Sequence, residues 1–249
     1  MGDFWAIYIL WLRDLKRYWY DKARIFASLG QPILFLFVLG TALGPSVATP
    51  GGVNFSEFIF PGIISMTVLF TSIFSAISIV WDREFGFLKE VLVAPVSRWS
   101  IVIGKALGGS TVAVIQGCLM LILAPLVGVK LTVLIVIQSV LVMFLIAFAI
   151  TGLGIVIAAR MKEMEGFQMV VNFVIMPIFF LSGALFPLDR LPGWLTVLTR
   201  LDPMTYGVDL LRHVMLGINT FHPVLAVAVM GVFTLIMFAI AVFEFNLAE

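Results

Sequence analysis

The sequence predicts an all-α membrane protein with six transmembrane helices, an N-terminal amphipathic interface helix and short re-entrant helices between spans five and six. Of its 249 residues, 62% are hydrophobic and only 12% are charged, whereas a soluble domain has about 25% charged residues. The mean hydropathy is +1.15. Six stretches lack Asp, Glu, Lys and Arg, and each is long enough to cross a hydrocarbon core. These stretches are 25–56, 58–81, 106–129, 131–159, 166–188 and 213–243.

The basic residues are unevenly distributed, and the positive-inside rule converts this bias into an orientation. Of the 15 Lys and Arg residues, five precede the first span, four flank the segment after the second, and two follow the fourth. The segments on the other side carry the remaining four, and none lies in the 44–56 loop. We therefore expect a multi-pass protein of the plasma membrane with cytoplasmic N- and C-termini.

Residues 3–24 predict a helix that lies on the membrane surface. Apolar residues recur at alternating spacings of four and three, which is one face of a helix. They are Phe4, Tyr8, Trp11, Leu15 and Tyr18. The opposite side carries Arg13, Lys16 and Arg17, which suit anionic headgroups. A generic membrane anchor and a contact with a partner protein both fit this pattern.

The first two spans are expected at about 26–43 and 57–81. The second carries hydroxyl side chains at intervals of four residues, and hydroxyls surrounded by lipid favour protein neighbours. That face should therefore look at another helix or at a transport pathway, which the first, second and fifth spans would line. The candidates for the pathway are Thr67, Thr71, Ser75, Gln168 and Asn172. For each of them, helix packing is the competing role.

The segment 82–96 interrupts the apolar sequence with five charges within nine residues. Read as a helix, it places Phe85, Leu88 and Leu92 on one face, because they are spaced i, i+3 and i+7. Pro95 would end the helix. The charges that lie away from the apolar face are Asp82, Arg83, Lys89 and Glu90. Such a cytoplasmic helix fits a docking element for a soluble partner, and a helix that lies on lipid is the alternative.

The remaining spans are expected at about 101–127, 131–158, 166–187 and 221–243. The third span contains Gly104-Lys105-Ala106-Leu107-Gly108, a spacing of small residues that permits close helix approach. Between the fifth and sixth spans, 188–217 predicts two short outer helices. The second of these should begin at Asp202-Pro203, with the acid as cap and the proline in the first turn.

Sequence motifs that are missing narrow the range of possible functions further. No G-x-x-x-x-G-K-[ST] motif occurs, so we expect no ATP site in this chain and no enzyme activity. We also expect no catalytic residues, no metal and no nucleic-acid partner. A stand-alone secondary transporter is the alternative, but such proteins place ionisable residues within their spans. Here the candidates Glu57 and Glu244 lie at span ends.

Three parts of the chain resemble the integral-membrane permease subunit of type-2 ABC exporters, closest to the branch of daunorubicin-type drug and nodulation-factor permeases. The first is F-I-F-P-G-I-I (58–64), and the second is R-E-F-G-F-L-K-E-V-L-V-A-P-V (83–96). The third is F-L-S-G-A-L-F-P-L-D-R-L-P-G-W-L (180–195) with L-D-P-M-T-Y-G-V-D-L-L-R (201–212). With the six-span layout, the resemblance covers nearly the whole chain.

The resemblance implies a homodimer that works with two separate ATP-binding cassette subunits, which would hold the ATP and Mg. It implies that 82–96 is the coupling helix, that 3–24 is an interface helix, and that 188–217 closes the outer side. The coupling residues would be Arg83, Glu84, Phe85, Gly86, Leu88, Lys89, Glu90, Leu92 and Pro95. The interface-helix residues would be Trp11, Arg13, Lys16 and Arg17.

We expect alternating access that moves a hydrophobic or amphiphilic substrate, a drug-like molecule or a lipid, out of the cytoplasm or the inner leaflet. The alternative within this family is a permease for lipid-linked glycan or polysaccharide. A glycan channel should be lined continuously by aromatic residues, whereas the 23 phenylalanines are spread over several spans.

Overall fold

The computed structural model of the chain describes residues 2–44, 47, 49–86 and 96–247, without the side chains of Arg24 and Arg190. Within these residues every regular element is a helix, so the predicted all-α class is confirmed. Six helices of this part are long and apolar enough to cross a membrane. They are α2 (Lys22–Leu43), α3 (Phe55–Ser75) continued by α4 (Ile77–Glu84), α6 (Arg98–Leu121), α7 (Val133–Arg160), α8 (Met164–Leu181) and α11 (Pro223–Leu247).

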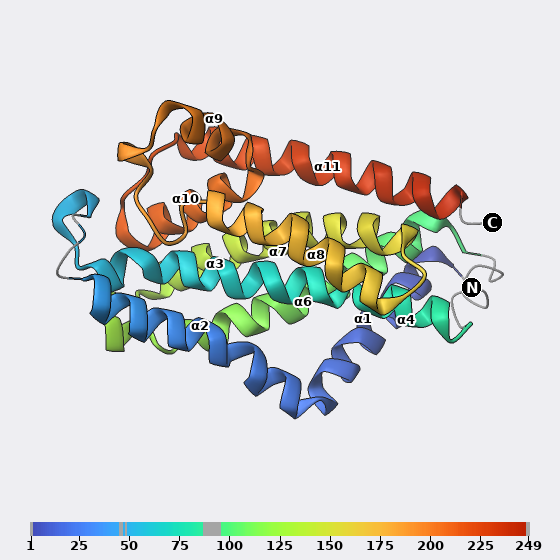
Figure 1. Ribbon diagram of the computed structural model, residues 1–249. Coiled ribbons are helices and arrows are strands. Elements are labelled where there is room, and N and C mark those ends of the chain that lie inside the picture. Colours follow the sequence, from blue (N-terminus) through green and yellow to red (C-terminus); the bar gives the residue numbers. More distant parts are fainter. Residues whose placement is uncertain (1, 45–46, 48, 87–95, 248–249) are drawn as a thin grey trace.

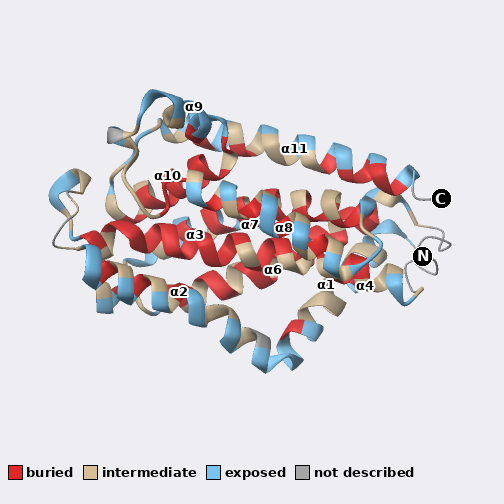
Figure 2. Cartoon of the chain, in the orientation of Figure 1, coloured by how far each residue is buried: buried red, intermediate tan, exposed pale blue. Residues whose placement is uncertain are grey.

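The spans run along one another in a single bundle, and both chain termini lie at the same end of it (Figure 1). Helices α3 and α6 form the centre, because 78% of the most apolar window of α3–α4 and 67% of that of α6 are buried. The corresponding shares are only 17% for α2 and 22% for α8 and α11. Figure 2 shows the same contrast between the buried centre and the more exposed outer helices. The outer spans therefore have faces left for lipid or for another chain.

Several helix ends differ from the predicted ones. Helix α8 ends at Leu181 rather than at 187, because Gly183 takes a φ of +69°, a left-handed conformation that ends helices. Helix α6 ends at Leu121 rather than at 127, and the 3-10 helix η2 (Ala124–Val127) follows it. The second span instead continues beyond 81, because α4 extends to Glu84.

The stretch between the fifth and sixth spans lies at the end of the bundle opposite to the termini (Figure 1). It contains the 3-10 helix η3 (Leu188–Arg190), α9 (Gly193–Leu201) and α10 (Pro203–Leu216). Asp202 caps α10, because its Oδ1 accepts a hydrogen bond of 2.9 Å from the Met204 backbone N–H. Pro203 occupies the first turn. The predicted start of this helix is confirmed.

Asp202 makes the stability of this outer end dependent on pH. Burial raises the pKa of its carboxyl from 3.8 to about 7, so between these values the folded chain keeps a proton that the unfolded chain has lost. Stability therefore falls as the pH rises through this window and is level above it. We expect a lower thermal midpoint at about pH 8 than at about pH 5 for the solubilised protein, and a smaller difference in Asp202→Asn. Asn caps helices as well as Asp does, so an unchanged pH difference in this variant would contradict the assignment.

Candidate functional site

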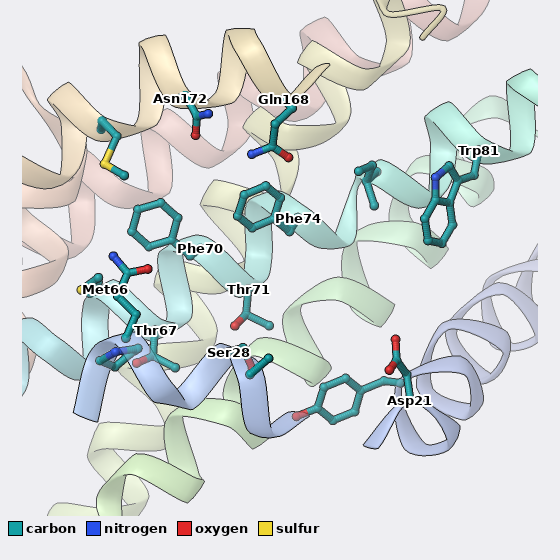
Figure 3. Close-up of a pocket in the computed structure, with 16 residues that line it drawn as sticks. Asp21, Ser28, Met66, Thr67, Phe70, Thr71, Phe74, Trp81, Gln168 and Asn172 are labelled. Carbon is teal, nitrogen blue, oxygen red and sulfur yellow. The ribbon is translucent and has the colours of Figure 1, made fainter. Parts of the chain in front are cut away.

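A partly open pocket of about 610 Å³ lies between α2, the α3–α4 span and α8, with the end of α1 (Asp3–Tyr20) at one side. Figure 3 shows side chains from these helices pointing into it. The α3–α4 face of the pocket follows helical spacing from Met66 to Trp81, as one side of a helix should. The lining residues are Tyr18, Asp21, Ala27, Ser28, Gln31, Pro32, Met66, Thr67, Phe70, Thr71, Phe74, Ile77, Trp81, Gln168, Asn172 and Met176.

The pocket combines aromatic walls with a few amide and hydroxyl groups. The rings of Phe70 and Phe74 stack at a centroid distance of 6.3 Å on one wall. The amides of Gln168 and Asn172 lie across from them on α8 (Figure 3). An apolar cavity with a small number of placed polar groups is the usual form of a site for an organic ligand. Its size and lining suit a hydrophobic or amphiphilic molecule.

Four of the five predicted pathway residues meet in this pocket: Thr67, Thr71, Gln168 and Asn172. Ser75 is a correction, because it does not line the pocket and its Oγ faces Gly109 of α6 instead. The reason is geometric: eight residues of α-helix turn through about 800°, which leaves Ser75 about 80° away from Thr67. Ser75 therefore has the packing role that competed with the pathway role.

The predicted coupling helix is only partly described. Helix α4 ends at Glu84, and Gly86 has a φ of +79°, so a continuous helix from 82 across this glycine is wrong. Phe85 follows α4 directly and is 80% exposed. Glycine stops the helix here because it adopts the left-handed conformation without a Cβ penalty. The coupling residues Leu88, Lys89, Glu90, Leu92 and Pro95 lie outside the described residues.

The two charged residues before this turn have different surroundings. Arg83 donates hydrogen bonds to the carbonyl oxygens of Ala159 (2.7 Å) and Met161 (2.6 Å) at the end of α7. A cation suits this position, because the last carbonyls of a helix lack intrahelical partners. Arg83 therefore binds the end of α7, a neighbour that the sequence did not indicate. Glu84 is exposed.

Helix α1 packs against α6. Trp11 donates from Nε1 to Thr111 Oγ1 at 3.0 Å, and the buried Tyr18 hydroxyl donates to Gln116. These two residues of the predicted apolar stripe therefore face α6 rather than lipid. Phe4, by contrast, is 78% exposed.

The basic side of α1 also faces protein in part. Arg13 donates to Asp82 on α4 at 2.6 Å, and the Arg17 guanidinium lies 3.9 Å from the centroid of the Trp81 ring. The expectation that Arg13 faces headgroups is therefore wrong, whereas Lys16 and Arg17 are exposed. Helical periodicity reveals two faces, but it does not reveal neighbours supplied by a distant part of the chain.

The sequence profile of the ABC-2 type transporter family matches residues 6–216, which include most of α1, the pocket and the outer helices. The chain belongs to the ABC-2 type transporter family. It is 30% identical over 207 residues to nodulation protein J of Rhizobium leguminosarum bv. trifolii, covering 82% of this chain and 77% of that protein. It is 32% identical over 186 residues to the transport permease ycf38 of Cyanophora paradoxa, covering 73% of this chain and 64% of that one. The chain is thus a membrane permease of an ABC transporter.

Glu244 and Glu57 are the two carboxylates that a secondary transporter could use. In this ABC-2 permease each of them has a hydrogen-bond partner outside the pocket. Arg160 holds Glu244 through two contacts, Nε to Oε2 at 2.9 Å and Nη2 to Oε1 at 2.5 Å. Glu57 accepts a hydrogen bond of 2.9 Å from Asn54. Neither carboxylate lines the pocket. Within the described part of the permease, no group of three or more His, Cys, Asp or Glu residues is arranged to hold a metal ion.

Proposed function

We propose that this permease exports a hydrophobic or amphiphilic substrate, a drug-like molecule or a lipid, from the cytoplasm or the inner leaflet. The energy comes from two separate ATP-binding cassette subunits, which bind the ATP and Mg, and the permease works as a homodimer by alternating access. The termini and the 82–96 segment face the cytoplasm. The single observation that carries the proposal is the pocket between α2, α3–α4 and α8, because it offers an amphiphile a place within the spans.

The pocket also supports the homodimer. It is partly open, and the spans that flank it, α2 and α8, are among the least buried of the six. A second copy placed against these spans would cover the open side and enclose the substrate. Movement of the two copies relative to one another would then open the pocket to one side of the membrane or to the other.

The exposed end of α4 supports contact with an ATP-binding subunit. A phenylalanine that is 80% exposed at a helix end is a suitable anchor for a groove on a soluble partner. It lies at the same end of the bundle as both termini (Figure 1), and the bias of basic residues marks this end as cytoplasmic.

The experiment that tests this proposal is mild affinity purification of the permease from its native membrane. We expect a near-stoichiometric ATPase to accompany the wild-type chain. The double variant Phe85→Ala/Leu88→Ala should lose most of it, because apolar anchors contribute strongly to docking in such interfaces.

The matched control is Phe243→Ala, which removes a 60% exposed phenylalanine from α11. This variant should retain the ATPase. A wild-type chain that purifies without an ATPase and still moves solute would exclude the proposal. Equal retention of the ATPase by all three proteins would exclude only the docking site.

A further inference from the structure

Four charged side chains from three helices meet near the cytoplasmic end of the bundle. Asp82 of α4 is at their centre: its Oδ2 accepts hydrogen bonds from Arg13 Nη2 at 2.6 Å and from Lys105 Nζ at 3.0 Å. Arg13 belongs to α1 and Lys105 to α6. One carboxylate oxygen therefore connects three helices: the interface helix α1, helix α4, whose last residues begin the predicted coupling segment 82–96, and α6, the third span.

A second carboxylate balances the charge of this cluster. Asp14 Oδ1 lies 3.6 Å from Lys105 Nζ and 3.8 Å from Arg13 Nε. The Lys105 side chain is only 6% exposed, and its ammonium also donates to Ser78 Oγ at 3.0 Å. Two carboxylates and two cations sum to zero, which is the condition under which charges are tolerated in an apolar bundle.

The packing around the cluster holds α1 close to α6. A Cβ at Gly104 would lie 3.2 Å from the Ile7 backbone, and one at Gly108 would lie 2.9 Å from the Asp14 side chain. Helix α1 therefore approaches α6 closely at the small-residue motif of the third span. The contact of Arg17 with the Trp81 ring joins α1 to α4 at a second point.

Asp82 is three residues from Phe85, so a displacement of the coupling segment acts directly on the helix that carries Asp82. We propose that Asp82 is a positioning residue that links α1 to the base of the coupling segment, so that α1, α4 and the start of α6 move as one unit. This inference rests on the proposed function, since an ATP-binding partner supplies the displacement. The interface helix then takes part in coupling, because ion pairs join it to α4 and α6.

The test measures the distance between α1 and α4 by paired spin labels. The chain has one cysteine, Cys118, so a Cys118→Ser background accepts labels at two chosen sites. Tyr20 and Glu84 are exposed and suit the labels. In nanodiscs we expect one narrow distance distribution, which is the same for the permease alone, for the complex with its ATPase, and for that complex with ATP.

The decisive variant is Asp82→Asn/Lys105→Met, because it removes one charge of each sign and leaves Arg13 balanced by Asp14. It should fold, but its distance distribution should broaden. In unlabelled complexes, the ratio of ATP hydrolysed to NBD-labelled phosphatidylethanolamine moved should be at least about fivefold higher for this variant than for the wild type. An increase of this size corresponds to the loss of a typical coupling free energy. The single variant Asp82→Glu keeps the carboxylate and should restore both readouts toward wild type.

The control Glu163→Gln changes an exposed carboxylate at the start of α8 and should leave both readouts unchanged. A narrow, unchanged distribution in Asp82→Asn/Lys105→Met would overturn the inference. If the permease had no ATPase partner, the proposed function would fail. The distribution for the permease alone would still show whether the charged cluster fixes α1 to α4.

Discussion

Replacing Gly62 with alanine is expected to destabilise the permease by about 3 kcal/mol, the upper end of the usual range for overpacking. Gly62 is fully enclosed in α3, and a Cβ there would lie 2.7 Å from the Ala184 carbonyl carbon and closer still to its oxygen. Because the obstacle is backbone, no side chain can rotate away to make room. The thermal midpoint of the solubilised protein, followed by size-exclusion chromatography after heating, measures the effect.

Gly231→Ala is the matched control, since Gly231 lies in α11 and a Cβ there meets nothing within 4 Å. Alanine is the better helix former by about 0.5–1 kcal/mol, so this variant should be neutral or slightly more stable. Equal midpoints for Gly62→Ala and the wild type would show that α3 and the loop after α8 are further apart than the structure places them.

Replacing Thr71 with tryptophan is expected to reduce transport by about tenfold or more, corresponding to about 1.4 kcal/mol or more in the barrier. Thr71 lines the pocket from α3, between Phe70 and Phe74 in sequence, and its side chain lies on the side of Ser28 of α2 (Figure 3). An indole placed there occupies the space that a substrate needs. Transport of NBD-labelled phosphatidylethanolamine in proteoliposomes that contain the ATPase complex measures the loss.

The control for this variant is Thr41→Trp, because Thr41 is exposed on α2 and does not line the pocket. It should transport as the wild type does. Both variants should still bind the ATPase, since neither changes the exposed end of α4. Full transport by Thr71→Trp would exclude this pocket as the pathway.

Most of the helices could be predicted from the sequence because their signals are local. The Asp202-Pro203 start of α10 needs only a cap and a proline, and both act within one turn. Two of the ends that were predicted wrongly, those of α8 and of the 82–96 helix, depended on the left-handed glycines Gly183 and Gly86. A glycine permits this conformation without requiring it, so the sequence does not decide where such a helix stops.

The pocket could be predicted in part because its residues share helix faces. Thr67 and Thr71 are one turn apart, as are Gln168 and Asn172, so each pair had to lie on a common face. The first span, α2, was expected to line the pathway, but none of its residues was named, although Gln31 in an otherwise apolar span was a usable signal. Ser75 was included wrongly because an interval of four residues, repeated twice, drifts around the helix.

The charged cluster was missed because its members are far apart in the chain. Lys105 inside the small-residue motif of a span was a signal, since a buried lysine requires a carboxylate partner. The sequence offered several carboxylates and no means of choosing Asp82 and Asp14 among them. Arg13 was assigned to headgroups for the same reason: amphipathic periodicity indicates two faces, and the neighbours of each face come from the fold.

The measurement that tests the account most directly is transport by the purified permease–ATPase complex in proteoliposomes, with ATP supplied only on the side that carries the ATPase. We expect NBD-labelled phosphatidylethanolamine to move from the leaflet on that side to the opposite leaflet, and to stop moving when ATP is withheld. Movement without ATP, or movement driven by a proton gradient alone, would contradict the account.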